Sequence, residues 1–159
     1  MKLPPLPKPR VGQVIRHSFL FSNGDEKDRP GVIVVAVDPL GNEEYHVAVM
    51  PITHSFSCDR RMAIEIPSRL KSHLGLDDDR SWIVINEINA FQWPGYDLKR
   101  VQGKGWEYGQ MPPRFMEQIV GRVKELEVRL HVILRNEDSV QDVKTKAVLS
   151  GHFKKPRVS

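Results

Sequence analysis

The stretch "DEKDRPGVIVVAV", residues 25–37, decides the fold class of this chain. Its first half is almost entirely charged, and its second half is aliphatic and mostly β-branched. A short β-branched run of this kind is typical of a strand that is buried on both faces. The stretch therefore predicts a polar loop that enters the protein core at Arg29 and Pro30.

The segments around this stretch predict further short strands. They are "VGQVIRHSFLF" (residues 11–21), "YHVAVMPIT" (45–53), "MAIEIP" (62–67) and "SWIVINEINAF" (81–91). Polar segments rich in turn-forming residues separate the first strands from one another, which is typical of an antiparallel meander. Residues 98–110 contain several glycines and predict no regular element.

Two segments predict helix. Residues 68–75 form one or two helical turns, with Ser68 as the N-cap and Gly75 as the C-terminal stop. A longer helix is expected from Pro113 to about Leu134, where apolar residues recur every three or four positions. These apolar residues are Phe115, Ile119, Val123, Leu126, Leu130 and Ile133. The predicted fold class is mainly β with α, a small and strongly bent antiparallel sheet or barrel capped by the C-terminal helix.

The composition predicts one soluble globular domain with extensions at both ends. The chain has 159 residues, of which 40% are hydrophobic and 28% are charged. We expect a proline-rich arm at residues 1–10, a barrel domain at 11–135, and a basic, partly disordered tail at 136–159. The net charge of +4 favours anionic partners such as nucleic acid.

Several classes of protein are not indicated by the sequence. No apolar run is long enough to span a bilayer, and the first residues lack the apolar region of a secretory signal. Cys58 is the single cysteine, so no intramolecular disulfide can form, which fits a reducing cytoplasm. Nucleotide-binding glycine loops, nucleophile elbows and metal-ligand spacings are absent from the sequence, and we expect no cofactor or metal. The acidic run "LDDDR" lacks the spacing of a calcium loop and reads as a solvated turn.

Three segments in a fixed order carry a family resemblance. They are "VGQVI", then "RPGVIVV", then "VAVMPIT", followed by "SWIVINEI" and the helix from Pro113. In this order they resemble the PemK/Kid/MazF family of toxins from type II toxin–antitoxin systems. The resemblance implies an SH3-like barrel with a C-terminal helix, a cytoplasmic homodimer and a cognate antitoxin. It also implies metal-independent cleavage of single-stranded mRNA, which leaves a 2′,3′-cyclic phosphate and a 5′-hydroxyl and inhibits growth.

The resemblance and the residue chemistry together indicate three catalytic candidates. Arg29 matches the family arginine, and a guanidinium can clamp a phosphate through two hydrogen bonds. Thr53 matches the family threonine at the end of its strand. His54 follows it and can transfer a proton near neutral pH, although the family does not require a histidine there. Alternatives remain for each of them: a surface ion pair of Arg29 with Asp25 or Glu26, an ordinary strand threonine, and an ordinary loop histidine.

A second set of residues is predicted to contact RNA. These are Asn23, Lys27, Ser55, Arg60 and Glu87. The aromatic and basic segment that includes Trp93, Tyr96, Trp106 and Tyr108 either stacks on bases or anchors a loop to the barrel. His17 lies inside the first strand, which favours a packed or surface role over proton transfer.

The sequence also departs from the family pattern. Asn23 stands where one branch, typified by Kid, has a histidine, and Val84 and Asn86 stand where that branch has an arginine and an aspartate. Glu87 is expected to face away from them in an alternating strand. The alternative function is therefore a non-catalytic barrel that binds nucleic acid, or a protein target such as gyrase. A further alternative is a structural module whose basic tail contacts a partner.

Overall fold

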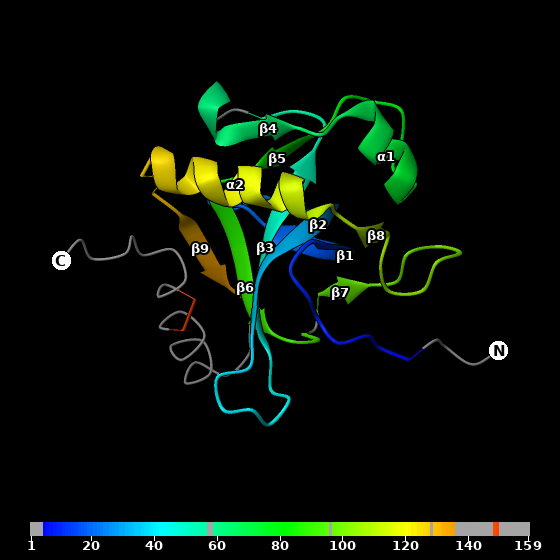
Figure 1. Cartoon of the computed structure of the whole chain (residues 1–159), viewed down its shortest axis with the longest axis vertical. Helices are drawn as coiled ribbons and strands as arrows, with labels where there is room; N and C mark the ends of the chain where they lie inside the picture. The colour runs from blue at the N-terminus through cyan, green and yellow to red at the C-terminus, as the bar shows by residue number, and fades with distance from the viewer. Residues whose placement is uncertain (1–4, 57–58, 96, 128, 136–147, 150–159) are drawn as a thin grey trace.

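The charged-to-aliphatic stretch forms an inner strand of a bent sheet (Figure 1). The computed structural model describes residues 5–56, 59–95, 97–127, 129–135 and 148–149. Strand β2 (Glu26–Val37) lies between β1 (Gln13–Leu20) and β3 (His46–Thr53), and both pairings are antiparallel. The predicted meander is therefore confirmed. The polar half of the stretch also belongs to the strand, because Glu26 to Asp28 pair with the end of β1.

Short strands extend the sheet on both sides of this meander. They are β4 (Ala63–Glu65), β5 (Trp82–Val84), β6 (Glu87–Gln92), β7 (Leu98–Lys99), β8 (Gly109–Gln110) and β9 (His131–Leu134). The strands β7 and β8 pair with β1, whereas β5 and β6 pair with different halves of β3. No described ladder joins the two ends, so the sheet is bent but not closed. The predicted class, mainly β with α on a bent sheet, is confirmed.

The expected single strand over residues 81–91 is wrong in detail. A turn at Ile85 and Asn86 divides it into β5 and β6. The first half pairs with the end of β3 at Ile52 and Thr53, and the second half pairs with the beginning of β3. The turn lets one segment follow both halves of β3 around the bend of the sheet.

The C-terminal helix is shorter than its apolar periodicity predicts. Helix α2 (Pro113–Glu125) ends at Leu126, and Glu127 adopts a left-handed backbone with φ of 49°. The chain then forms β9, which runs parallel to β6. Its residues include Val132 and Ile133, and β-branched side chains favour a strand once a partner strand is available.

Helix α1 (Ser68–Leu74) follows the prediction closely. Gly75 ends it with a left-handed φ of 67°, as expected for a C-terminal glycine. Pro67, however, occupies the N-cap position, and Ser68 is the first helical residue. A one-turn 3-10 helix, η1 (Arg60–Met62), precedes β4. None of the described helices has the length and apolarity needed to cross a membrane.

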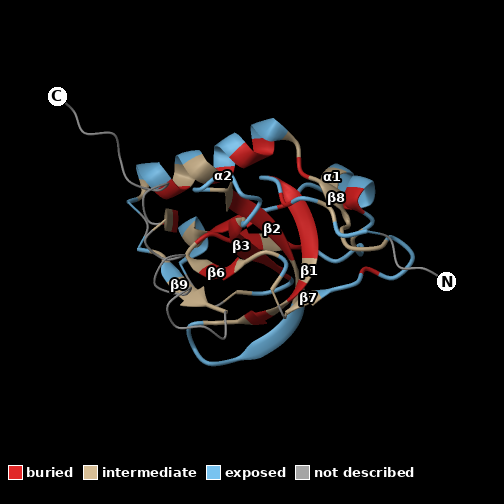
Figure 2. Ribbon diagram, turned by 90° about the horizontal axis from the view of Figure 1, so that it is seen from below, coloured by how far each residue is buried: buried red, intermediate tan, exposed pale blue. Residues whose placement is uncertain are grey.

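Most residues of the central strands β1, β2 and β3 are buried, as the red ribbon of Figure 2 shows. The main cluster includes Phe115, Met116, Ile119 and Val123 of α2 packed against the sheet. A second cluster on the other face consists of Ile15, Phe19, Ile33, Val47, Val49 and Phe91. The β-branched run of β2 contributes to both clusters, which explains its nearly continuous apolar sequence.

Gly31 permits the close packing of this second cluster. A Cβ atom at Gly31 would lie 2.5 Å from the Phe19 ring and 2.7 Å from a methyl group of Val49. The glycine of the Arg-Pro-Gly step therefore lets an aromatic ring of β1 lie directly on the backbone of β2.

The described parts of the two extensions both contact the domain. The Trp93 indole donates to the carbonyl of Pro7 at 3.1 Å, and Arg10 forms a two-bond ion pair with Glu107. Leu149, within the expected tail, is buried in the main cluster. Apart from Val148 and Leu149, the tail lies outside the described residues, as do Cys58 and Tyr96.

Candidate functional site

A groove of about 390 Å³ lies where β2, the end of β3 and the turn between β5 and β6 meet. All but one of the predicted site residues line it: Asn23, Lys27, Arg29, Thr53, His54, Ser55 and Glu87. Arg60 does not, because it lies on η1 beside Arg61 and Arg122 of α2. The structure thus brings together residues that the sequence spreads over more than half of the described domain.

The pairing of β2 with β3 explains why Arg29 and Thr53 meet. Gly31 pairs with Pro51, and continuing this antiparallel register places Arg29 opposite Thr53. The two family-like motifs therefore approach one another through backbone pairing. His54 and Ser55 follow directly at the end of β3.

The Arg29 side chain has no described carboxylate partner. Its guanidinium donates to the backbone carbonyl of Asp28 at 3.1 Å. The neighbouring carboxylates are occupied elsewhere, since Arg16 pairs with Asp28 at 2.6 Å and Arg135 pairs with Glu26 at 2.8 Å. Within the described residues, the guanidinium charge is thus available to an anion in the groove.

The Thr53 hydroxyl is already engaged. It donates to the carbonyl of Ser55 at 2.7 Å, and Thr53 is buried. In this arrangement the hydroxyl proton cannot also be donated to a phosphate. Thr53 therefore shapes the turn that carries His54 and Ser55, and its oxygen can still accept a hydrogen bond.

His54 is held by a carboxylate from the loop after α1. Its Nε2 lies 2.8 Å from Oδ2 of Asp77 and 3.0 Å from Oδ1. Lys71 of α1 also contacts Asp77, at 3.1 Å. Partial burial acts to raise the pKa of Asp77, but hydrogen bonds from Lys71 and His54 outweigh it, so this pKa lies below its ordinary value.

His54 and Asp77, together with Asp79, could also hold a cation. Ligand atoms of His54, Asp77 and Asp79 lie within 4.8 Å of one another, and all three residues are exposed. A divalent cation there would compete with the ammonium of Lys71 for Asp77. Sequence spacing did not indicate this cluster, because the histidine and the acidic run lie on separate segments.

The rim of the groove is fixed by hydrogen bonds between the β1–β2 loop and β6. Glu87 accepts hydrogen bonds from the backbone N–H and the hydroxyl of Ser22. Within the loop, the side-chain oxygen of Asn23 accepts a hydrogen bond from the backbone N–H of Asp25 at 2.9 Å. The expectation that Glu87 faces away from Asn86 is wrong, because the turn before β6 brings both to the groove.

Two aromatic residues of the groove were not predicted from the sequence. Phe21 and Phe56 both line it. Phe56 packs edge-on against Trp82, with ring centroids 5.4 Å apart, and the guanidinium of Arg80 lies 5.0 Å from the centre of the Trp82 ring. The only available signal was the position of these aromatics beside the two motif strands.

A second groove of about 310 Å³ adjoins the first one. Arg29 and His54 line both grooves, and Tyr108 and Asp77 line the second. The two residues thus stand between two neighbouring hollows. Such a site suits a chain molecule that continues on both sides of a bound anion.

The aromatic segment before α2 is anchored to the domain. Trp93 bonds with Pro7, and the Lys104 ammonium donates to the carbonyls of Leu74 and Tyr108 at 3.1 and 3.2 Å. These contacts agree better with a loop that is anchored to the domain than with an open surface on which bases could stack. Tyr108 is the member of this segment that also reaches the second groove.

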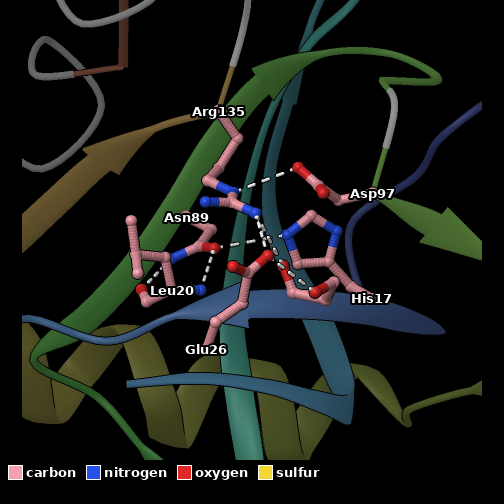
Figure 3. Close-up of polar contacts among 7 residues, drawn as sticks. His17, Leu20, Glu26, Asn89, Asp97 and Arg135 are labelled. Carbon is pink, nitrogen blue, oxygen red and sulfur yellow. Dashed lines mark hydrogen bonds and ion pairs between the residues drawn. The ribbon is translucent and has the colours of Figure 1, made fainter. Parts of the chain in front are cut away.

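His17 is a packed residue that lines neither groove, and its polar contacts are drawn in Figure 3. Its ring stacks on Phe91 with centroids 4.9 Å apart, and its Nε2 lies 3.3 Å from Oδ1 of Asn89. Burial lowers the pKa of His17 to about 4, against the opposing effects of Asp97 and Asn89. In the same region Arg135 joins Asp97 to Glu26, as the dashed lines of Figure 3 show.

Comparison with known proteins does not identify a family for this chain. The sequence matches no protein-family model, and no curated protein matches it at a significant level. Functional inference therefore rests on the ordered motifs and on the geometry of the groove.

Proposed function

We propose that this chain is the toxin of a type II toxin–antitoxin system, a PemK/MazF-like endoribonuclease that cuts single-stranded mRNA without a metal. The observation that supports it most is the meeting of Arg29 and His54 in one groove. Arg29 has no described carboxylate partner, and His54 is held by a carboxylate. One residue can neutralise a phosphate while the other moves a proton.

The proposed reaction uses the 2′-hydroxyl of the substrate as nucleophile. His54 accepts the proton of this hydroxyl, and the oxygen attacks the adjacent phosphorus. The bond from phosphorus to the 5′-oxygen breaks, and that oxygen takes a proton from water. The hydroxide that this leaves takes the proton from His54, which restores the neutral ring. Arg29 stabilises the extra negative charge on the phosphorane between these steps. The products are a 2′,3′-cyclic phosphate and a 5′-hydroxyl.

The surroundings of Arg29 suit a single-stranded nucleic acid. Lys27 supplies a second cation in the groove, and Phe21 and Phe56 supply aromatic surface. Bases stack on aromatic side chains, whereas phosphates attract basic residues. The adjoining second groove gives room for the strand to continue past Arg29.

Incubating the purified protein with a long single-stranded RNA in EDTA tests the proposal. We expect discrete cuts with cyclic phosphate ends. Arg29→Ala should slow cleavage about 100-fold or more, as for loss of a group that stabilises a transition state. Arg114→Ala, an exposed arginine on α2, is the matched control and should cut normally. Intact RNA at high protein concentration, or equal cutting by Arg29→Ala, would refute the proposal.

A non-catalytic bent-sheet module that binds nucleic acid, or a protein target such as gyrase, is the second candidate. It is favoured by the engagement of Thr53 with Ser55 and of Asn23 with Asp25, since neither side chain is poised for proton transfer. In that case the protein binds single-stranded RNA, or a protein target, and leaves RNA uncut. Filter binding measured beside the cleavage assay separates the RNA-binding outcome from the nuclease.

The proposed partners are a second copy of the chain and a cognate antitoxin. Both follow from the family resemblance alone. Light scattering of the purified chain tests the homodimer. Expression with and without the neighbouring open reading frame tests for an antitoxin, which should relieve growth inhibition.

A further inference from the structure

We infer that Asp77 is a positioning residue for His54, and that the buried Lys71 holds Asp77 in place for this role. The inference rests on the proposed nuclease function and identifies the residues that orient its proton-transfer group, His54. The family resemblance offers no such partner, because Asn23, Val84 and Asn86 replace the residues of the Kid-like branch. The loop after α1 supplies one instead.

The geometry assigns the two nitrogens of His54 different roles. Nε2 lies within hydrogen-bond distance of both oxygens of Asp77, at 2.8 and 3.0 Å. An ionised carboxylate only accepts hydrogen bonds, so Nε2 carries the proton and donates it. The neutral ring then has its lone pair on Nδ1. Nδ1 is therefore the nitrogen that accepts the 2′-hydroxyl proton, and Asp77 stabilises the imidazolium that forms.

The turn after α1 explains how Asp77 reaches this position. Gly75 ends the helix with φ of 67°, and the N–H of Leu76 bonds back to the carbonyl of Lys71 at 2.9 Å. The chain therefore folds back over the last turn of the helix. Asp77 is thereby placed against both the ammonium of Lys71 and the ring of His54.

Lys71 is an unusual anchor because it is buried. Its side chain is 6% exposed, whereas that of Asp77 is 53% exposed. A buried ammonium requires compensation, and Asp77 is its ion-pair partner among the described residues. The contact at 3.1 Å fixes Oδ1 of Asp77, and the N–H of Asp79 donates to the same oxygen. The carboxylate thus has two partners, Lys71 and the backbone of Asp79, in addition to His54.

Other titratable groups line the same two grooves as His54. They are Asp25 of the β1–β2 loop, Lys27, Asp28 and Arg29 of β2, Glu87 of β6, and Tyr108 before β8. Asp28 is paired with Arg16, and Glu87 with Ser22. Among the described carboxylates, Asp77 is the one in hydrogen-bond contact with the ring.

Kinetics of RNA cleavage in EDTA test this assignment. Asp77→Asn should lower kcat about 10- to 100-fold with little change in KM, less than the loss of about 10⁴-fold seen for a buried triad aspartate, because Asp77 is half exposed. Asp78→Asn removes the same charge from the next residue and should leave kcat unchanged. In a His54→Ala background, Asp77→Asn should cause no further loss, because a positioning residue acts only through the ring.

Lys71 is tested by a pair of substitutions. Lys71→Met should lower kcat in the same direction as Asp77→Asn, and Lys71→Arg should retain most of the activity. Thermal unfolding of each variant shows whether it folds. Should Lys71→Met fail to fold, the comparison of Asp77→Asn with Asp78→Asn still decides the assignment.

Nitrogen NMR of the His54 ring gives a readout that does not depend on RNA cleavage. At pH 8 the wild type should show a proton on Nε2 only, and Asp77→Asn should show a mixture of tautomers. If the wild type cuts no RNA, the nuclease proposal fails. If wild type and Asp77→Asn show the same tautomers of His54, Asp77 does not position this ring.

Two kinetic results would overturn the inference itself. One is full cleavage by Asp77→Asn under conditions where Arg29→Ala is inactive. The other is cleavage by the wild type that stops in EDTA and returns when Mn²⁺ is added, while Asp79→Asn does not recover. That result would assign His54, Asp77 and Asp79 to a metal ion.

Discussion

Acidification should destabilise this protein through His17. The ring is fully buried and stacked on Phe91, and burial lowers its pKa from 6.5 to about 4. Burial makes protonation of the ring unfavourable, and the contact with Asn89 fixes the proton of the neutral ring on Nε2. The side-chain NH2 group of Asn89 donates to the carbonyl of Leu20, and the side-chain oxygen of Asn89 accepts from the N–H of Leu20. Because this oxygen only accepts, the Nε2 of His17 that contacts it carries the proton of the neutral ring. A second proton would go to Nδ1, which has no partner among the described residues.

The size and sign of the effect follow from the two pKa values. The folded form keeps the ring neutral down to about pH 4, whereas the unfolded chain binds a proton below about pH 6.5. The stability contributed by the neutral ring is therefore present above pH 6.5 and is lost as the pH falls toward 4. At ~1.36 kcal/mol per pH unit, the loss reaches about 2 kcal/mol at pH 5 and about 3 kcal/mol below pH 4.

Urea unfolding of wild type and His17→Gln between pH 8 and pH 5 measures this effect. Glutamine can still donate to Asn89 and does not titrate. Between pH 7 and pH 5 the wild type should lose about 2 kcal/mol more unfolding free energy than the variant. His73→Gln, at an exposed position of α1, is the control and should follow the wild type. Parallel curves for wild type and His17→Gln would show that His17 does not cause the loss of stability.

Three further outcomes are expected. Gly31→Ala should cost about 1–3 kcal/mol of unfolding free energy, because the new methyl group overlaps the Phe19 ring, and an unchanged melting temperature would contradict this packing argument. Asn89→Ala should cost about 2–3 kcal/mol, because both backbone groups of Leu20 lose their partner, while Asn42→Ala in an exposed turn should cost less than 1 kcal/mol in the same urea titration. Phe56→Ala should weaken binding of single-stranded RNA by about 1–3 kcal/mol in a fluorescence titration, and equal affinity would exclude base stacking on that ring.

Local sequence predicted the elements whose signals lie within a few residues. The β-branched run after Arg29 forms β2, the alternating segment before His54 forms β3, and Gly75 ends α1. Each depends on backbone propensity and side-chain period, which neighbours along the chain specify. The order of the motif strands also indicated that Arg29 and Thr53 belong to one site.

The misassigned elements depend on partners that are distant in sequence. The apolar residues after Glu125 continue a helical period, but pairing with β6 makes residues 131–134 a strand. The turn at Ile85 and Asn86 lacks glycine and proline, so no local signal divides β5 from β6. It arises because one segment must follow both halves of a bent β3.

The candidate site shows the same division. Local patterns and the order of the motifs predicted the mainly-β class, the central strands and the candidates Arg29, Thr53 and His54. Only the tertiary structure placed Asp77 and Lys71 against His54, brought Glu87 and Phe56 to the groove, and buried His17. The physical reason is that strand propensity is a local property, whereas a hydrogen bond between a loop and a distant strand end depends on register, helix length and the bend of the sheet together.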